Sequence, residues 1–292
     1  MSIDRDILFR LATSTRLERV MRSVPRGQDL AWRAASRYVA GTSVAEAVRL
    51  VREFHGQGVA GSIDQFGELV GDPAVARRVA DDYVSLATEL AHLPEDTWLA
   101  IDLSHLGLDV DPARCADNLA AIAQALPEGR RVQVGAEDHV RADAVLSCVL
   151  TAAGRGLAGR LGATVQANLH RTPDDARCLL DAGVHIRLVK GAYVEPSDRA
   201  YPYGEPTDVA FLRLAHQLAE AKAPFALATH DGVLREALIA AHGPVPVEQL
   251  LGVRPDVVTD LVARDVPVRV YVPFGHNWFR YWMRRVAESR GA

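Results

Sequence analysis

Cysteine is rare in this sequence of 292 residues: it has three, Cys115, Cys148 and Cys178, and no two of them form a C-x-x-C pair. An odd number of unpaired cysteines does not provide a disulfide framework and is typical of reduced thiols in the cytosol. We therefore expect a cytoplasmic protein in which the cysteines are small buried hydrophobic residues.

Long apolar runs are also absent. No segment approaches the roughly 18 consecutive apolar residues of a membrane span. Residues 1–21 mix charges into a helical pattern, in place of the continuous apolar stretch of a signal peptide. The formal net charge is −4, so no basic field favours nucleic acid or an anionic membrane. The sequence predicts no nucleic-acid partner and at most a peripheral contact with membranes.

Two familiar signatures of ligand binding are missing. The ten histidines are scattered, with no H-x-H or H-E-x-x-H spacing, so we expect no metal site. No G-x-G-x-x-G follows the first predicted strand, where a doubly wound sheet would carry its phosphate-binding loop. The dense glycine cluster at 154–162 precedes a strand, which also speaks against that fold.

What is present is a large hydrophobic share, 49%, which is enough to bury a full core. The N-terminal part of the chain is predicted to be helical in three segments. Ser43 and Glu46 have the spacing of a capping box at the start of the third. The three predicted helices are Asp6–Met21, Ala31–Val39 and Ser43–His55.

After Gly58, eight short apolar segments alternate with eight helical patterns. This alternation predicts a parallel sheet closed on itself, a (βα)8 barrel, with a doubly wound open sheet as the rival. We expect a helical extension over residues 1–58 and a catalytic barrel domain over 59–292. The predicted strands are Val59–Phe66, Trp98–Leu103, Arg131–Val134, Ala163–Leu169, His185–Val189, Phe225–Ala228, Val245–Leu250 and Val268–Val272. The predicted helices are Pro73–Leu93, Pro112–Ala125, Ala142–Leu157, Pro173–Ala182, Thr207–Ala221, Gly232–Ala241, Pro255–Ala263 and Asn277–Ser289.

Side chains at the carboxyl ends of barrel strands face the active site, and the segment from His185 to Tyr193 is the most informative of these ends. Lys190 follows an apolar strand and needs an acceptor, because an unpaired buried charge is costly. Gly191 lets the backbone approach a ligand closely. Arg187 and Val189 share one face of the predicted strand, so in a regular strand Lys190 would point to the other face. A lysine snorkelling at the strand rim is the structural alternative.

The last predicted helix carries two adjacent arginines, Arg284 and Arg285. They form either a solvated helix face or a fork for a carboxylate over the barrel mouth. His230 follows another strand, and a lone histidine of this kind is more often satisfied by the backbone than used in chemistry.

Five motifs, in order along the chain, resemble the flavin-dependent proline dehydrogenases. The motifs are RLVKGAY at 187–193, ATHD at 228–231, EQLLGV at 248–253, RVYVPFG at 269–275 and YWMRRVAE at 281–288. RYVAGT at 37–42 and DQFGE at 64–68 resemble the family's N-terminal part, so the resemblance spans roughly residues 37–289. It implies a distorted (βα)8 barrel that binds FAD, oxidises the C–N bond of proline to an imine and passes electrons to a quinone-type acceptor.

The resemblance also implies roles for single residues. Arg187 would lie beside the flavin and favour its reduced, anionic form. Arg284 and Arg285 would hold a substrate carboxylate, and Tyr193 and Tyr271 would line the substrate pocket. The residues implied to hold FAD are Gln166, Lys190, Gly191, Ala192, Thr229 and His230.

Two positions depart from the family pattern. Asp102 stands where the family has a lysine that helps to bind the carboxylate, and Gly135 stands where it has an aspartate. An aspartate about 4 Å from a substrate carboxylate would cost roughly 4 kcal/mol at an effective dielectric constant near 20, on the order of a thousandfold in affinity. We therefore expect free L-proline to be a poor substrate, and an altered amine, imino acid or hydrazine-like compound to take its place near Asp102.

The sequence is also compatible with two other classes of function. A Schiff-base lyase could use Lys190 as its nucleophile. A non-catalytic flavin- or ligand-binding protein would be consistent with the loss of the lysine and aspartate, although the retained arginines argue against it.

Overall fold

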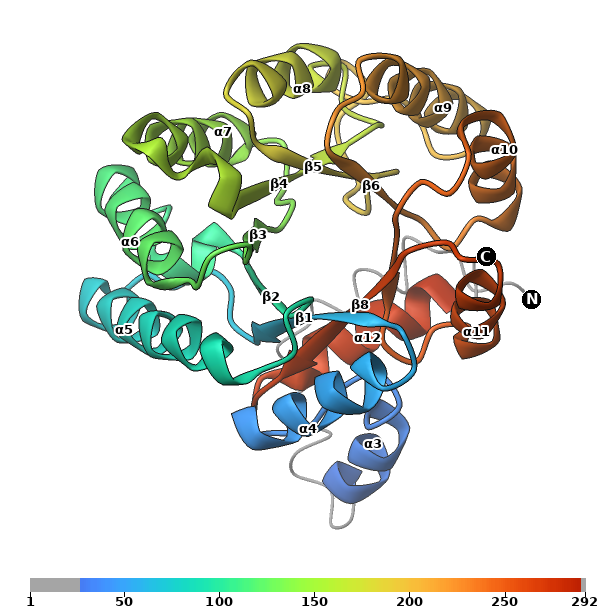
Figure 1. Ribbon diagram of the computed structural model, residues 1–292. Helices are drawn as coiled ribbons and strands as arrows, with labels where there is room; N and C mark the ends of the chain where they lie inside the picture. Colours follow the sequence, from blue (N-terminus) through green and yellow to red (C-terminus); the bar gives the residue numbers. More distant parts are fainter. Residues whose placement is uncertain (1–26, 290–292) are drawn as a thin grey trace.

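The structure, a computed structural model, describes residues 27–289, and within them the predicted barrel is confirmed. Eight parallel strands pair in sequence order and close between β8 and β1 (Figure 1). The predicted helix Asp6–Met21 lies outside the described residues. The strands are β1 (Ala60–Gln65), β2 (Trp98–Ile101), β3 (Val132–Val134), β4 (Leu161–Gln166), β5 (His185–Val189), β6 (Phe225–Ala228), β7 (Val247–Leu250) and β8 (Val268–Phe274).

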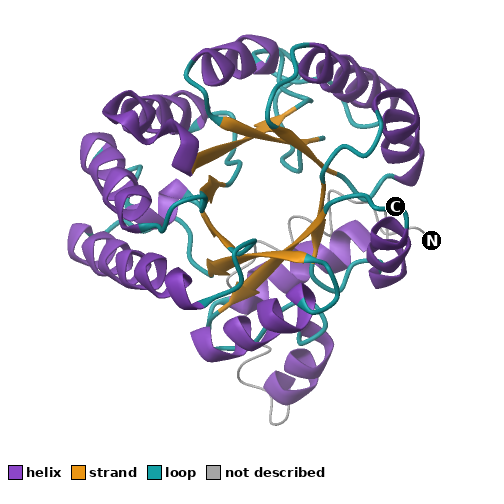
Figure 2. Cartoon of the chain, in the orientation of Figure 1, coloured by secondary structure: helices purple, strands orange, loops and turns teal. Residues whose placement is uncertain are grey.

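Helices surround the barrel (Figure 2). Within residues 27–289 the α-helices are α3 (Gly27–Ala35), α4 (Val44–His55), α5 (Pro73–Glu89), α6 (Pro112–Ala125), α7 (Ala142–Ala152), α8 (Thr172–Asp181), α9 (Glu205–Glu220), α10 (Gly232–His242), α11 (Pro255–Ala263) and α12 (Trp278–Ser289). The capping box is confirmed, because the backbone N–H of Ser43 donates to the Glu46 carboxylate at 3.0 Å. None of the described helices is long and apolar enough to span a membrane.

Some predicted boundaries were wrong. The first described helix ends at Ala35, because the chain then turns and Ala40 donates its N–H to the carbonyl of Pro273 on β8. The helix predicted over 142–157 loses regular form after Ala152, where Gly156 adopts a positive φ of 83°. The fourth strand ends at Gln166, since the residues after it enter a turn that leads into α8.

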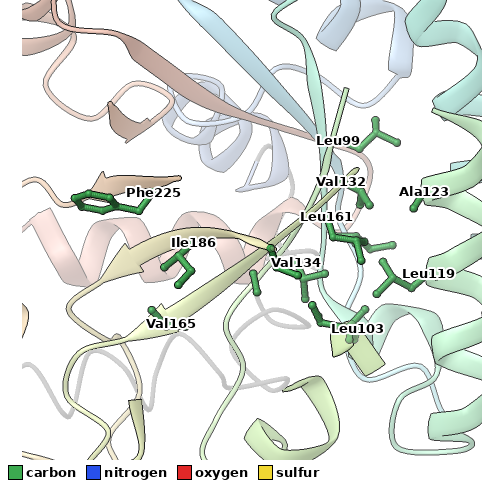
Figure 3. Packing of buried hydrophobic residues seen from close by; sticks show 14 of the residues in the cluster. Leu99, Leu103, Leu119, Ala123, Val132, Val134, Leu161, Val165, Ile186 and Phe225 are labelled. Carbon is green, nitrogen blue, oxygen red and sulfur yellow. The ribbon is translucent and has the colours of Figure 1, made fainter. Parts of the chain in front are cut away.

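The main core lies between the barrel and its helices. Figure 3 shows Leu99, Val132 and Leu161 from three adjacent strands beside Leu119 and Ala123 of α6. Because side chains alternate along a strand, burial of Leu99 and Ile101 in this layer turns Ala100 and Asp102 toward the barrel interior. The packing of Leu99 and Ile101 against the helices thus places the site on the other face of β2.

Two of the three cysteines behave as predicted. Cys115 and Cys148 are buried between α6 and α7, whereas Cys178 is exposed, so the expectation that all three are buried was wrong. Ala176 and Leu179 form part of the buried face of α8. Cys178 falls on the outer face of that helix.

The helix layer closes in an unusual way next to β1 and β8. α4 packs against both strands, and Gly61 of β1 permits the close approach, since a Cβ there would lie 2.6 Å from Val51. α12 is packed instead against α3, with Trp32 and Trp278 in edge contact at 5.1 Å. Tyr281 of α12 also lies 5.1 Å from Phe66, just beyond the end of β1. The last helix therefore reaches the carboxyl ends of the strands.

Candidate active site

The barrel interior holds a buried ion pair between Arg187 on β5 and Glu248 on β7. The Arg187 Nε donates to Glu248 Oε2 at 2.8 Å, and both residues are buried. Burial opposes ionisation of Glu248, but Arg187 and the nearby Arg269 outweigh it and lower the pKa of Glu248. Arg187 therefore remains a fixed cation inside the barrel.

Asp64, at the end of β1, accepts two hydrogen bonds from phenols. The hydroxyl of Tyr83 on α5 donates to it at 2.6 Å, and that of Tyr271 on β8 donates at 2.5 Å. Burial raises the pKa of Asp64 to about 6, while the two hydrogen bonds and the charge of Arg187 hold the rise in check. The predicted pocket residue Tyr271 is thus tied to an acid that titrates near neutrality.

Asp102 directly follows β2, and its carboxylate receives no hydrogen bond from the part of the chain that the structure describes. Burial and the charge of Asp64 raise its pKa to about 7, with Glu68 adding to the rise and Arg284 and Arg187 opposing it. A Cβ added at Gly135 would overlap Asp102 Oδ1. The two departures from the family pattern are therefore one structural change, because the carboxylate of Asp102 fills the space above Gly135.

The two predicted arginines of α12 have different surroundings. Arg284 lies 3.2 Å from Glu68 Oε2, and Glu68, Tyr193 and Asp102 raise its pKa against the effect of burial. Arg285 lies over the ring of Tyr281, at 4.9 Å from its centroid. Adjacent helical residues diverge by about 100° around the axis. A joint fork of Arg284 and Arg285 for one carboxylate thus stays a prediction.

Tyr193 lies in the loop after β5 and reaches across the barrel mouth. Its hydroxyl donates to the carbonyl of Ala136 at 3.2 Å, while the residue is 44% exposed. Burial of its hydroxyl end and the charge of Asp102 raise the pKa of Tyr193, and Arg284 opposes the rise. The structure therefore brings Tyr193 into the same electrostatic environment as Asp102 and Arg284.

Lys190 leaves the barrel interior, as strand alternation predicts. Its Nζ lies 2.5 Å from Asp208 on α9 and 3.0 Å from Asp231 at the start of α10. Burial lowers the pKa of Lys190, but the two carboxylates outweigh this and raise it. The amine therefore stays protonated at neutral pH. A lysine that forms a Schiff base must attack as the neutral amine. No observation favours the lyase.

The ends of β4, β5 and β6 have features that suit a polar ligand. The buried atoms Asn168 Oδ1 and His230 Nδ1 have no hydrogen-bond partner within residues 27–289. Burial and Arg285 lower the pKa of His230 to about 4, so the ring is neutral at pH 7. At Gly191, φ is +112° and a Cβ would overlap Asn168, so both the backbone conformation and the space there require glycine.

The other predicted cofactor residues surround this place. Gln166 donates to the carbonyl of Glu137 at 2.8 Å, and the Thr229 hydroxyl accepts from the N–H of Asp231 at 3.1 Å. Ala192 is exposed beside Gly191. These residues, the fixed cation of Arg187 and the unpartnered atoms fit a flavin in chemical character. The role of each stays a proposal.

Sequence reasoning missed two residues that shape the site. Asp208 lies in the first turn of α9, where an acidic residue is ordinary helix chemistry, so nothing in the sequence connects it to Lys190. Tyr83 occupies a buried position of an amphipathic helix, where an aromatic residue is typical of the core. Asp64 and Glu68, by contrast, lie at or just beyond the end of β1, where the barrel rule looks for them, whereas Glu248 is the second residue of β7.

The chain forms a closed (βα)8 barrel. The mouth of the barrel combines buried guanidinium groups, phenols and carboxyl groups that titrate near neutrality. This combination defines a barrel enzyme for a small polar substrate. Known proteins identify the kind of enzyme.

The family model described as "Proline dehydrogenase" matches residues 47–292. The chain is 34% identical over 300 residues to "Proline dehydrogenase" of Deinococcus radiodurans, covering 97% of this chain and 95% of that one. It is 31% identical over 263 residues to "Proline dehydrogenase 1" of Bacillus subtilis strain 168, covering 87% of this chain and 86% of that one. The chain therefore belongs to the proline dehydrogenase family and is a flavin-dependent dehydrogenase.

Solved structures confirm the fold. The structure of proline utilization A from Bdellovibrio bacteriovorus, inactivated by N-propargylglycine, superposes with a TM-score of 0.82 at 17% identity. The match covers 98% of this chain but 38% of the other, so this chain corresponds to about two fifths of that larger protein.

Proposed function

We propose that the protein uses FAD to oxidise the C–N bond of a proline-like secondary amine to an imine, and that the substrate differs from free L-proline. The observation that carries this is the family match, together with Arg187 held as a fixed cation inside the barrel. When bound, the flavin supplies the hydride acceptor. We further propose a quinone-type electron acceptor and a cytoplasmic location, with at most peripheral membrane contact.

Six residues are proposed to hold FAD, as the family resemblance implies. Lys190 carries one positive charge between two carboxylates, so it must give up one of these contacts to meet a phosphate. Arg187 would stabilise negative charge that develops beside it, since it is buried and always protonated. The six residues are Gln166, Lys190, Gly191, Ala192, Thr229 and His230.

The charges around Arg284 support an altered substrate. Arg284 faces both Glu68 and Asp102, so one guanidinium meets two carboxylates before any substrate arrives. A free carboxylate added there would meet negative charge rather than a vacant cation. Tyr193 and Tyr271 remain as walls for a ring, with Tyr271 fixed by Asp64.

The test begins with the visible spectrum of the purified protein, in which a bound oxidised flavin absorbs. Candidate amines are then mixed with it anaerobically, one at a time: L-proline, L-prolinamide, pyrrolidine and a hydrazine. We expect bleaching by at least one amine and slow bleaching by L-proline. A colourless protein would overturn the flavin assignment, and efficient turnover of L-proline with a quinone would overturn the altered substrate.

A further inference from the structure

The carboxylate of Asp102 is placed to meet a ligand rather than another part of the protein. It continues the line of β2 into the barrel mouth and is only partly exposed. Within the described chain, no hydrogen bond reaches the side chain of Asp102. In Asp64, by contrast, both carboxylate oxygens accept a hydrogen bond from a phenol. A carboxylate removed from bulk water and left without donors has unmet hydrogen-bonding capacity.

Carboxyl groups outnumber guanidinium groups around Asp102, which gives this part of the mouth an excess of negative charge once they are ionised, above about pH 7. Four carboxyl groups, including that of Asp102, meet three guanidinium groups, and one of these guanidiniums, Arg187, is already paired with Glu248. The phenols of Tyr193 and Tyr271 lie in the same field and are neutral. The groups that face Asp102 or its neighbour Glu137 are Asp64 and Glu68 from β1 and its loop, Glu137 and Arg141 after β3, Arg187 on β5, Tyr193 after β5, Tyr271 on β8 and Arg284 on α12.

The missing side chain at position 135 keeps Asp102 in this place. Gly135 N donates to the carbonyl of Ile101 at 2.9 Å, so β2 and β3 remain paired up to this point. A Cβ at 135 would overlap Asp102 Oδ1. The glycine therefore fixes where the carboxylate lies, and a larger residue would move it without removing its charge.

We propose that Asp102 binds the ammonium group of the substrate and accepts its proton, and that the substrate is a cyclic secondary amine whose neighbouring carboxyl group is absent or neutralised as an amide or ester. This rests on the proposed function and names its substrate class. In the step, one N–H bond of the ammonium breaks, its electron pair stays on nitrogen, and the proton forms an O–H bond on the carboxylate. No electrons leave the substrate at this stage. The freed lone pair is what later loss of hydride from the adjacent carbon requires.

A raised pKa suits this role, since an acid that titrates near pH 7 accepts an amine proton far more readily than an ordinary aspartate. The same property gives the test a pH signature. Below about pH 7 a growing fraction of Asp102 is protonated by solvent, and binding of an ammonium ligand must weaken there.

The experiment measures binding to the purified protein, whatever its flavin content, after reduction with dithionite so that no turnover occurs. L-Prolinamide and L-proline are titrated calorimetrically between pH 5.5 and 8.5; they share the ring and the amine and differ in the carboxylate. We expect L-prolinamide to bind about tenfold or more tightly than L-proline above pH 7, and its affinity to fall as the pH is lowered through 7.

Variants separate the role of Asp102 from a general effect. Asp102→Asn should weaken L-prolinamide about tenfold, abolish the pH dependence of its binding near 7, and leave L-proline unchanged or tighter. Gly135→Ala, which displaces the carboxylate, should also weaken L-prolinamide. The matched control is Asp117→Asn, an exposed aspartate that pairs with Arg155 far from the mouth, and it should change nothing.

Equal binding of L-prolinamide by the wild type and Asp102→Asn, or preference of the wild type for L-proline, would overturn the inference. These outcomes differ from failure of the proposed function, which appears as absence of flavin or of bleaching by any amine. If an amine bleaches the flavin but Asp102→Asn binds L-prolinamide as the wild type does, the role of Asp102 is rejected and the proposed dehydrogenase function is retained.

Discussion

Arg187 and Glu248 form an ion pair across the barrel interior, with 2.8 Å between the Nε of the arginine and the Oε2 of the glutamate. They lie on β5 and β7, and the strand between them, β6, carries alanine at 226 and 228. Ala226 is the register partner of Arg187, so a small side chain leaves room for the pair to form over β6. The pair fixes the cation that the proposed chemistry needs, and it connects strands that do not hydrogen-bond to each other.

Removing one partner of this pair should be costly. We expect Glu248→Leu to lower the free energy of unfolding by about 3–5 kcal/mol, because it leaves the buried guanidinium without its counter-charge. Urea denaturation measures the change. The double variant Arg187→Met/Glu248→Leu should recover part of the loss, since the buried guanidinium of Arg187 is then gone and only Arg269 still lacks the charge of Glu248. The control is Asp260→Asn, which removes an exposed partner of Arg264 and should cost less than about 1 kcal/mol.

Asp102 should make stability depend on pH. Its pKa is about 7 in the folded protein, above the ordinary value of 3.8, so folding penalises the ionised form. The penalty is absent below about pH 4, grows between pH 4 and 7, and is complete above pH 7. Asp102→Asn removes it, and we expect the variant to be about 2–4 kcal/mol more stable than wild type at pH 8.

The measurement compares urea midpoints of wild type and Asp102→Asn at pH 4, 6 and 8. Other buried groups also titrate in this range: Asp64 and Glu137 act in the same direction, while buried histidines with lowered pKa values act in the opposite one. The contributions of the histidines are common to both proteins and cancel in the difference. Asp64 and Glu137 interact with the charge of Asp102, so the difference also includes this coupling. A difference that stays constant over the three pH values would contradict the prediction. The histidines concerned are His105, His185 and His230.

Lys190 offers a test of its charge state and of its proposed place beside FAD. Borohydride reduction in the presence of a small carbonyl compound should leave Lys190 unlabelled at pH 7, because its amine is protonated between Asp208 and Asp231. Lys190→Met should lower the flavin retained through purification by about tenfold, if one phosphate contact is lost. Peptide mass mapping and the absorbance ratio of flavin to protein are the readouts. Covalent trapping on Lys190 would restore the lyase as a candidate.

Gly191 can be tested against a matched glycine. Gly191→Ala should cost about 2–4 kcal/mol of stability and reduce flavin retention, because it adds both a left-handed strain and an overlap with Asn168. Gly129 also has positive φ, at +76°, but a Cβ there meets nothing within 4 Å. Gly129→Ala should therefore show the strain alone, about 1 kcal/mol, with unchanged flavin. Thermal unfolding and flavin absorbance distinguish the two.

Much of the fold could be predicted because its signals are local. The bounds of β5 and β6, and of α6 and α11, are those that apolar periodicity and proline starts indicate. Boundaries failed where a distant contact ended an element early, as when the hydrogen bond from Ala40 to Pro273 turns the chain after α3. The proposal that residues 1–58 form a separate extension stays a prediction, although α4 packs directly on β1 and β8.

The alternation of strands and helices and the two unusual residues at 102 and 135 can be recognised in the amino-acid sequence without coordinates. These follow from side-chain periodicity and residue chemistry, which need no knowledge of neighbours in space. Tertiary structure alone decided that Lys190 turns to Asp208 and Asp231, that Arg284 meets Glu68, and that Asp102 lies over Gly135. The physical reason is that charge pairing and close packing depend on distances between residues far apart in the chain, and these are fixed when the barrel closes.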